Sequence, residues 1–583
     1  MAINKRGEVC IVNYCCTGWK CNNKDLSHQD AAPIYGLVIG LALLGLILSV
    51  IALQQTKFYL AKHPQKKKQL PSFIRKISAL SRASKYHSFK IRNWYLPHTI
   101  ALIGIFVLFL WLTVWAFATL PYYSHDFETE KPPLATRAGS LAVALIPFIF
   151  TLGSRVNPIS LATGISHEKL QTYHQYGSRI LLFISLVHGI PMLLQPYYEG
   201  YKTGGYAAGR TRLQEAWESN AHFESGTVLI VFLVWINVSS MRVFRRISYE
   251  FFVFQHVITT VAFLANLFPH VNVTYMDAWN YLFAAVALVL YSWFGRLAIT
   301  IYSNKLSTSH AQLENLTEGM TRLSIKTKIK WKPGQHIYIR FPFLKPLQSH
   351  PFTITSIPST DSEHSVIQLL ARAKNGMTKV LHDRAQEGNT YLPCFIDGAY
   401  GGSIPLDGYT NVLLLSGGTG ITCNMPLLLD LIQKMEAGKS ACQHIDFIWS
   451  IRSKKSLEWF DATFRSLSRL ASYQNVRVRV FLTGDKSAPP TSSSIATSIS
   501  SDSSSSITEK KLYEIITSRP DLEGLLNESA RQSAGTSLGL SVCGPKLFNW
   551  KVMNKVADIE LGIAMEDSCL PTTLYAHSEN FAS

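Results

Sequence analysis

Seven long apolar runs constrain this chain of 583 residues more than any other feature of its sequence. Each run has roughly 17 to 26 residues, and a helix needs about 20 to cross a hydrocarbon core of about 30 Å. A hydrophobic content of 47% with only 16% charged residues agrees with a membrane protein. We therefore expect seven transmembrane helices, near residues 33–53, 95–120, 137–153, 173–195, 226–241, 252–270 and 277–302.

The positive net charge of +18 is explained by basic residues that set the membrane topology rather than by nucleic-acid binding. No recognition motif for nucleic acid is present, and the basic residues cluster beside the apolar runs. Residues 57–92 carry eleven Lys or Arg and no acidic residue, which predicts a cytoplasmic loop against the lipid bilayer. Seven spans then place the N-terminus outside and the C-terminus in the cytosol. We expect the plasma membrane, with the vacuolar membrane as the alternative.

The tail of residues 1–32 is expected on the extracytoplasmic side. It has no apolar core of its own, so the first span is expected to serve as the insertion signal. The tail contains Cys10, Cys15, Cys16 and Cys21. Outside the cell these cysteines can form disulfides, whereas palmitoylation is the competing interpretation if the tail faces inward.

Four histidines in the membrane carry the most chemical information. His174 and His188 in the fourth span are 14 positions apart, and so are His256 and His270 in the sixth. At about 100° per residue this spacing returns to nearly the same helix face after roughly 21 Å. Because one span intervenes, the two helices run parallel, and His174 should face His256 while His188 faces His270. Paired neutral imidazoles suit two stacked b-type haems that transfer electrons.

Single histidines in a span are also packing residues or line proton paths, but two equal spacings on parallel helices favour haem ligation. The fourth span adds Gly177, which could admit a porphyrin, and Arg179. Arg179 fits two roles equally well, as partner of a haem propionate or as a lipid-headgroup anchor.

Residues 304–406 change to short alternating strands that predict a small antiparallel barrel. Within it, His350-Pro351-Phe352-Thr353 opens a strand with an aromatic and a hydroxyl. Alone this motif is weak evidence for a flavin site, but it is followed in the sequence by a phosphate-binding pattern, and that order makes it informative. The strands expected here include Met320–Lys326, Gln335–Phe341 and Val366–Ala373.

Residues 407–583 have the features of an α/β nucleotide-binding domain. The apolar strand Asn411–Ser416 leads into Gly417-Gly418-Thr419-Gly420-Ile421 and then a helix expected near Pro426. Glycines at such a turn let backbone amides approach a pyrophosphate, although an ordinary glycine turn is the alternative.

Three further features complete this domain. A strand over Ile445–Ser450 ends at Arg452, whose charge could bind a 2′-phosphate and select NADPH. A later strand, Leu538–Val542, delivers Cys543-Gly544-Pro545 to the same sheet edge, and Phe581 near the C-terminus could stack on a flavin. Residues 486–508 are mostly Ser, Thr, Ala and Pro, which predicts a disordered insertion.

In combination these motifs resemble the fungal ferric reductases, relatives of the NADPH oxidases, from about residue 95 onward. The resemblance implies a multi-pass helical haem domain over 33–303, followed by a cytosolic ferredoxin-reductase-like module with an FAD barrel and an NADPH-binding domain. It matches Asp397-Gly398-Ala399-Tyr400-Gly401 to a flavin phosphate turn, with Ala399 in place of proline. The residues assigned to FAD are His350, Pro351, Phe352, Thr353 and Gly401, and those assigned to NADPH are Gly417, Gly418, Thr419, Gly420, Ile421, Arg452, Cys543, Gly544 and Pro545.

The implied function is an NADPH-dependent ferric-chelate reductase, active also on cupric ions, that supports iron and copper uptake. Electrons would pass from cytosolic NADPH through FAD and two haems to metal outside, where a loop over 197–225 offers Glu199, His222 and Glu224 as candidate ligands. A metal permease or oxidase is a candidate partner.

Two other functions were weighed. An NADPH oxidase that makes superoxide is the main alternative, but such oxidases typically shorten the second histidine pair by one residue, whereas both spacings here are 14. A transporter or channel with a nucleotide-sensing domain is the third, and it predicts no haem.

Overall fold

The structure is a computed structural model in which the chain divides into two compact units. The helical unit comprises Met1–Leu53, Gly104–Thr163 and His167–Trp293, and the sheet unit comprises Gln54–Ile103, Gly164–Ser166 and Phe294–Ser583. The structure describes all residues except 1, 4–8, 12–13, 18–19, 22–31, 63–70, 93, 125–130, 272–275, 306, 347, 360–363, 375, 389, 471–474, 485–512 and 581–583. The predicted insertion at 486–508 therefore lies outside the described residues, and so does Phe581.

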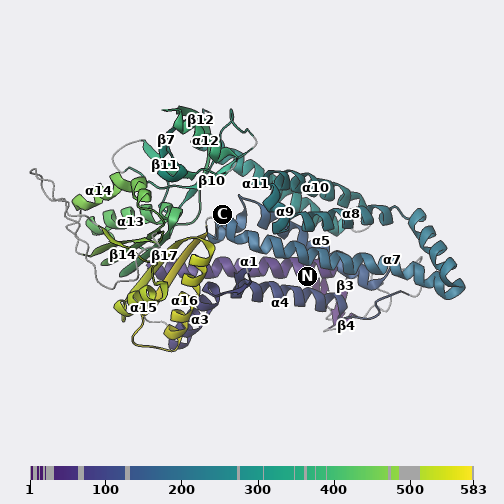
Figure 1. Cartoon of the computed structure of the whole chain (residues 1–583). Coiled ribbons are helices and arrows are strands. Elements are labelled where there is room, and N and C mark those ends of the chain that lie inside the picture. Colours follow the sequence, from purple (N-terminus) through teal and green to yellow (C-terminus); the bar gives the residue numbers. More distant parts are fainter. Residues whose placement is uncertain are drawn as a thin grey trace, which may run out of the picture. The chain divides into compact units, whose positions relative to one another are not determined.

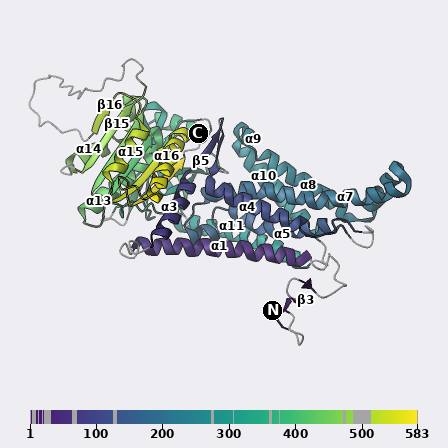
Figure 2. The ribbon, with the colours of Figure 1, turned by 90° about the horizontal axis from the view of Figure 1, so that it is seen from below.

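Seven helices among the described residues are long and apolar enough to cross a membrane, which confirms the expected number of spans. In Figures 1 and 2 most of them run side by side along one direction. They are α1 (Ala32–Lys62), α4 (Thr99–Phe117), α5 (Pro133–Gly153), α7 (His167–Ser219), α8 (Ala221–Ser239), α10 (Tyr249–His270) and α11 (Met276–Asn304). Two short helices, α6 (Pro158–Thr163) and α9 (Arg242–Ile247), lie between them.

Helix α5 is the centre of the helical unit. In the most apolar part of α5, 72% of the residues are buried, whereas in the most apolar parts of the other six helices only 11% to 22% are buried. The sequence of α5 is rich in Ala, Gly and Ser, and small side chains let neighbouring helices approach closely. The other spans keep apolar side chains on their outer faces, as helices in contact with lipid tails do.

Helix α7 is much longer than the predicted span at 173–195. It continues over 53 residues to Ser219 and is interrupted at Gly204 and Gly205, where φ of Gly205 is 72°. The prediction of a loop over 197–225 was therefore wrong, because most of that segment is helical and α8 begins at Ala221. Glycine at the interruption permits a backbone conformation that a residue with a Cβ atom rarely adopts.

The first sheet is antiparallel and contains six strands in the order β10-β9-β12-β7-β8-β11. Beyond β10, the amide of Thr355 donates to the carbonyl of Gln368 in β11 at 2.8 Å, which brings the two ends of the sheet together into a barrel. The predicted antiparallel barrel is thus confirmed. Its strands are β7 (Ser309–Leu316), β8 (Met320–Thr327), β9 (His336–Arg340), β10 (His350–Thr353), β11 (Ser365–Arg372) and β12 (Thr390–Tyr400), with η2 (Thr317–Gly319) and α12 (Met377–Gln386) between them.

The second sheet is parallel, with strand order β16-β15-β14-β13-β17-β18, as expected for an α/β nucleotide-binding domain. Its strands are β13 (Asn411–Gly417), β14 (His444–Ile451), β15 (Val476–Leu482), β16 (Tyr513–Ile516), β17 (Ser537–Gly544) and β18 (Thr573–Asn580). The helical segments are η3 (Gly418–Gly420), α13 (Ile421–Glu436), η4 (Lys454–Phe460), α14 (Asp461–Leu470), α15 (Leu522–Gln532) and α16 (Lys546–Ala564).

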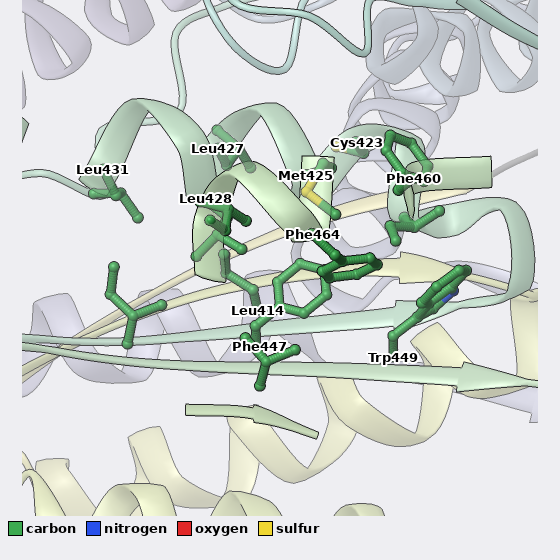
Figure 3. Close-up of a cluster of buried hydrophobic side chains, with 14 of the residues drawn as sticks. Leu414, Cys423, Met425, Leu427, Leu428, Leu431, Phe447, Trp449, Phe460 and Phe464 are labelled. Carbon is green, nitrogen blue, oxygen red and sulfur yellow. The ribbon is translucent and has the colours of Figure 1, made fainter. Parts of the chain in front are cut away.

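Separate apolar clusters fill the two faces of this sheet. On one face, side chains of α13, η4 and α14 pack on Leu414, Phe447 and Trp449, as Figure 3 shows. On the other face, α15 and α16 pack on a second cluster that includes Leu413 and Leu540. Alternate residues of β13 therefore serve opposite faces, as in a sheet covered by helices on both sides.

Two smaller pieces complete the fold. Between the first two spans lie α3 (Ser72–Tyr86) and a hairpin of β5 (Ser88–Ile91) and β6 (Trp94–His98), all within the sheet unit. The N-terminal tail contains short antiparallel strands β1 (Ala2–Ile3), β2 (Val9–Ile11), β3 (Tyr14–Thr17) and β4 (Lys20–Cys21). Their backbone register sets Cys10 opposite Cys15 and Cys16 opposite Cys21, and the disulfides stay a prediction.

Candidate functional site

The four membrane histidines form two pairs in the helical unit. The ring centroids of His174 and His256 are 6.4 Å apart, and those of His188 and His270 are 6.1 Å apart. Each pair joins α7 to α10, so the two helices present one imidazole pair at each of two levels. A gap of this size can hold a metal ion between two imidazole nitrogens, since metal–imidazole bonds are about 2 Å long.

Hydrogen bonds fix the orientation of the two histidines on α7. His174 Nδ1 donates to the carbonyl of Ile149 at 2.9 Å, and His188 Nδ1 donates to the carbonyl of Ala135 at 2.8 Å. A carbonyl can only accept, so the proton is on Nδ1 and the lone pair is on Nε2. This is the tautomer that a metal-binding histidine needs.

The two histidines on α10 have serine partners. His256 Nδ1 lies 3.3 Å from the hydroxyl of Ser240, and His270 Nδ1 lies 3.0 Å from that of Ser225. Both hydroxyls already donate to the carbonyl one helical turn earlier, so they accept from Nδ1. All four histidines therefore offer Nε2, and this donor set fits bis-histidine haem ligation.

Three glycines on α5 and α8 make room for the imidazoles. A Cβ atom on Gly139 would lie 2.8 Å from His188 Nδ1, and one on Gly153 would lie 2.9 Å from two ring atoms of His174. On α8, a Cβ atom on Gly226 would lie 2.9 Å from His270 Cε1. These glycines are not identifiable as site residues from the sequence. The only available signal was the presence of glycine in helices of a membrane bundle, which has many other causes.

Arg137 is a second residue that the sequence analysis missed. It is fully buried near the start of α5, two residues beyond the carbonyl that accepts from His188. Its guanidinium donates to the carbonyls of Ala116 and Thr119, at 3.2 and 2.8 Å. A buried guanidinium is costly unless it is hydrogen-bonded, and these two carbonyls supply partners for it.

The predicted porphyrin contacts in the fourth span are less defined. A Cβ atom on Gly177 would be in ordinary contact with Ile149 of α5, at 3.5 Å. Arg179 lies over the ring of Tyr176, with 4.8 Å between the guanidinium carbon and the ring centroid. Both interpretations of Arg179 stay open.

In the sheet unit, the residues assigned to a flavin flank one strand. In β10, Pro351, Phe352 and Thr353 pair with β9, and Thr353 lies opposite His336. On the other side of β9, the end of β12 places Tyr400 opposite the same His336. The motif at 350–353 and the turn at 397–401 are therefore neighbours across one strand.

The turn after β12 has features that suit a bound phosphate. Gly401 has φ of 96°, and its carbonyl accepts from Gln335 Nε2 at 2.8 Å. The rings of His336, Tyr338 and Tyr400 pack together with centroids 5.6 to 6.1 Å apart. A glycine turn beside an aromatic cluster is a suitable environment for a dinucleotide with a flat ring.

The last transmembrane helix is joined directly to this turn. Asn304, the final residue of α11, exchanges two hydrogen bonds with the backbone of Ile396, at 2.7 and 2.9 Å. Ser303 donates to the carbonyl of Gly398 at 2.8 Å, and Arg296 forms an ion pair with Asp397 at 3.3 Å. Side-chain hydrogen bonds and one ion pair therefore anchor the end of α11 to β12.

The predicted nucleotide turn and Cys543-Gly544-Pro545 meet at the carboxyl edge of the parallel sheet. A Cβ atom on Gly420 would lie 1.9 Å from the carbonyl oxygen of Cys543, and one on Gly417 would lie 2.9 Å from Pro545 Cδ. Both positions therefore require glycine, and Gly418 has φ of 57°. Helix α13 begins at Ile421 rather than near Pro426, and Pro426 lies inside the helix, where it removes one backbone donor. The helix N-terminus thus follows the glycines directly, as pyrophosphate binding requires.

A buried polar network holds the start of α13 in place. Asn424 Nδ2 donates to the carbonyl of Leu415 at 2.8 Å and to the hydroxyl of Ser416 at 3.0 Å. Its Oδ1 accepts from the hydroxyl of Ser541 in β17 at 2.7 Å. Trp449 adds a bond from Nε1 to the carbonyl of Gly418 at 2.9 Å. The sequence analysis did not identify Asn424 or Trp449.

Arg452 lies exposed one residue beyond the end of β14. A Cβ atom on Gly484 would lie 2.1 Å from the carbonyl oxygen of Arg452, so the backbone at this edge is tightly packed. The next segment, η4, docks on the barrel: Trp459 Nε1 donates to the carbonyl of Thr317 at 3.2 Å, and Arg322 donates to that of Trp459 at 2.7 Å. The strand that ends at Arg452 is therefore fixed relative to the barrel.

Cys543 is a packing residue in this arrangement. Burial, followed by its contact with Cys423, raises the pKa of the Cys543 thiol well above its ordinary value, so the thiol is protonated at neutral pH. The register of β18 sets Asn580 beside Gly544, which ends the strand at the same edge.

The candidate acceptor residues are not gathered into a metal site. Among the described residues, no group of three or more His, Cys, Asp or Glu could hold a metal ion. Glu199 accepts from Gln195 at 2.8 Å. The ring of His222 lies 5.9 Å from that of His270, and Glu224 lies in the first turn of α8.

Comparisons with known families match three consecutive parts of the chain. Residues 138–267 match the ferric reductase like transmembrane component, 305–412 match an FAD-binding domain, and 409–557 match the ferric reductase NAD binding domain. His174, His188 and His256 lie within the first match and His270 lies just beyond its end, while the nucleotide turn lies within the third.

Fungal proteins with related sequences agree with these matches. The chain is 32% identical to an Aspergillus oryzae protein named "Probable cell surface ferric reductase kap2", over 65% of this chain and 52% of that protein, so it spans about half of that relative. It is 28% identical to Ferric/cupric reductase transmembrane component 7 of Saccharomyces cerevisiae, over 81% of this chain and 78% of that one. It is 25% identical to Ferric reductase transmembrane component 1 of Schizosaccharomyces pombe, over 79% and 85%. The chain therefore combines in one polypeptide a part similar to the ferric reductase transmembrane component, an FAD-binding domain and a ferric reductase NAD binding domain, and over most of its length it is similar to fungal ferric and ferric/cupric reductases.

Proposed function

We propose that this protein is a transmembrane NADPH-dependent ferric-chelate reductase that also accepts cupric ions. The observation that carries the proposal is the pair of imidazole pairs between α7 and α10, with every Nδ1 directed at an oxygen and every Nε2 left as donor. The names of the fungal relatives support ferric and cupric substrates.

The residues of the chain would hold three kinds of cofactor. His174 with His256 and His188 with His270 would each hold one b-type haem. Residues 350–353 and Gly401 would hold FAD, and the turn at 417–421, Arg452 and residues 543–545 would hold NADPH. When bound, FAD would accept a hydride from NADPH, and the haems would supply single-electron transfer across the membrane.

The chain itself would position and insulate these groups. The bonds to Ile149 and Ala135 keep the α7 imidazoles in one tautomer and orientation. The contacts of η4 and of the end of α11 with the barrel hold the nucleotide edge and residues 296–304 on the flavin domain. Fixed geometry favours electron transfer because a protein that does not reorganise keeps donor and acceptor at constant separation.

The expected topology places the nucleotide domains in the cytosol and the N-terminus outside. The support is the basic loop over 57–92, together with Arg242, Arg245 and Arg246 after the fifth span. We place the protein in the plasma membrane, where reduced metal would be delivered to an uptake system such as a permease or oxidase.

The test measures anaerobic, NADPH-dependent reduction of a ferric chelate by oriented vesicles. We expect His188→Ala to abolish this activity while NADPH oxidation with a soluble dye acceptor continues, because only the membrane relay is broken. Full chelate reduction by the variant would contradict the proposal. The control is His98→Ala, the last residue of β6, which is not one of the four membrane histidines.

The comparisons do not favour the NADPH oxidase alternative, since the relatives are named ferric or ferric/cupric reductases. The same vesicles test it in air. An oxidase would lose chelate reduction on addition of superoxide dismutase, whereas direct metal reduction is unaffected.

A further inference from the structure

The segment between the first two spans has two chemically different sides. The side of α3 that carries Ala79, Ala83 and Tyr86 is buried against the nucleotide domain. Arg82 donates to both oxygens of Glu560 in α16, at 2.6 and 3.0 Å, and the Glu560 side chain is fully buried. This side of α3 is therefore firmly docked.

The docking extends to the edge of the parallel sheet. The hydroxyl of Tyr86 accepts from the amide of Ala576 in β18, at 3.0 Å, and β18 is the edge strand. Trp550 Nε1 donates to the carbonyl of Ser88 in the β5–β6 hairpin, also at 3.0 Å. The strand that ends beside Gly544 is thus covered by the segment that precedes the second span.

The opposite side of α3 is apolar and exposed. Phe73 is 71% exposed, Ile77 49% and Leu80 48%. Their spacing of four and three residues forms one stripe along the helix. Two basic residues, Arg75 and Lys76, lie near its start, and α3 contains no acidic residue. Lys76 forms an exposed ion pair with Glu566 at 3.4 Å, so Arg75 is the basic residue at this end that carries the charge argument. An apolar stripe on a basic helix is typical of helices that lie in the headgroup region of a membrane.

The segment that contains α3 is connected in sequence to a membrane-spanning helix on each side. Helix α1 ends at Lys62, ten residues before α3, and α4 begins directly after the hairpin. The residue that caps α3, His87, is bonded to Thr99, the first residue of α4: their side chains are 2.8 Å apart, and the Thr99 amide donates to the His87 carbonyl at 3.0 Å. The end of α3 is therefore fixed to the end of a span.

We propose that the exposed stripe of Phe73, Ile77 and Leu80 binds the anionic lipid surface, so that α3 clips the nucleotide-binding domain to the membrane. The occupant is a lipid surface because α3 is tethered to spans on both sides. Its lipid is anionic because residues 57–92 hold eleven basic and no acidic side chains. The clip acts beyond the reductase activity, and its test does not depend on that activity.

Photocrosslinking in the full-length protein tests the clip. Benzoylphenylalanine replaces Phe73, and in a matched protein it replaces Phe343, which is 82% exposed in the barrel domain. Both proteins are illuminated in nanodiscs of phosphatidylcholine with or without phosphatidylserine. We expect lipid adducts at position 73, most abundant with phosphatidylserine, and none at 343. A protein adduct at position 73, or no adduct in anionic nanodiscs, would overturn the proposal.

A second variant separates lipid binding from folding. Ile77→Glu with Leu80→Glu places two charges on the exposed stripe and leaves the contacts of Arg82 and Tyr86 intact. We expect the lipid adduct at position 73 to fall to the background seen at position 343, while protein yield and dye reduction by NADPH stay unchanged. An undiminished adduct would show that the stripe does not bind lipid.

Discussion

A histidine in a membrane span binds metal only if its ring is oriented and its proton is on the correct nitrogen. Here the orientation comes from main-chain carbonyls of α5 and from serine hydroxyls of α8 and the residue after it. The spacing of 14 predicted which histidines face each other. It could not predict the oxygen partners, because these lie on helices far away in the sequence.

The glycines that contact the histidine rings can be tested one residue at a time. In Gly153→Ala the new Cβ atom would lie 2.9 Å from two atoms of His174, so the ring must shift. We expect about half of the reduced b-type absorbance to disappear, because one of two haem sites is disturbed. The control is Gly104→Ala in α4, where a Cβ atom meets nothing within 4 Å. Equal spectra from the two variants would contradict the assignment.

Arg452 is a second test at this scale. A charge-assisted hydrogen bond to phosphate contributes about 1.5–3 kcal/mol, so Arg452→Ala should lower the preference for NADPH over NADH by about 10- to 100-fold. The measurement compares kcat/KM for the two nucleotides with a soluble dye. Lys439→Ala, an exposed cation after the far end of α13, should leave the ratio unchanged.

Among the elements, α13 shows how a helix start is fixed by residues that a motif search ignores. The glycine turn is visible in the sequence, but Asn424 connects it to β13 and β17 through bonds to Leu415, Ser416 and Ser541. The sequence gives no sign of this, because asparagine in a helix has no fixed role. The predicted start near Pro426 is also wrong, because α13 begins five residues earlier at Ile421.

Removal of that network should weaken nucleotide binding. Asn424→Ala leaves buried polar partners unsatisfied, which costs about 1–3 kcal/mol each. We expect a higher KM for NADPH and a lower unfolding temperature of the nucleotide domain, with an unchanged haem spectrum. Gln433→Ala, exposed on the same helix, is the control. An unaltered KM for NADPH would show that the network does not support the site.

Helix α7 is an element of which the sequence predicts only one part. The apolar run predicted its membrane part, whereas its polar continuation to Ser219 has no apolar period and was interpreted as a loop. Length and hydropathy define the part in lipid, but a helix that leaves the membrane is stabilised by local bonds that composition does not reveal.

For the whole molecule, the direction of electron flow depends on the orientation in the membrane. We expect an epitope at the N-terminus to be accessible in intact spheroplasts, and exposed Cys569 to react with an impermeant maleimide only after permeabilisation. Labelling of Cys569 in intact spheroplasts would reverse the topology. The order of the three domains was readable from motifs, while the docking of α3 on α16 was not, because it joins residues almost 500 positions apart.

The junction at Asn304 has a consequence for how such proteins can be recombined. Four side-chain contacts join residues 296–304 to the start of the flavin turn. A chimaera cut at the apparent boundary near residue 304 would separate partners that fold together. The reductase module of this chain therefore begins inside its last span. A chimaera that exchanges this module should include residues 296–304 of α11.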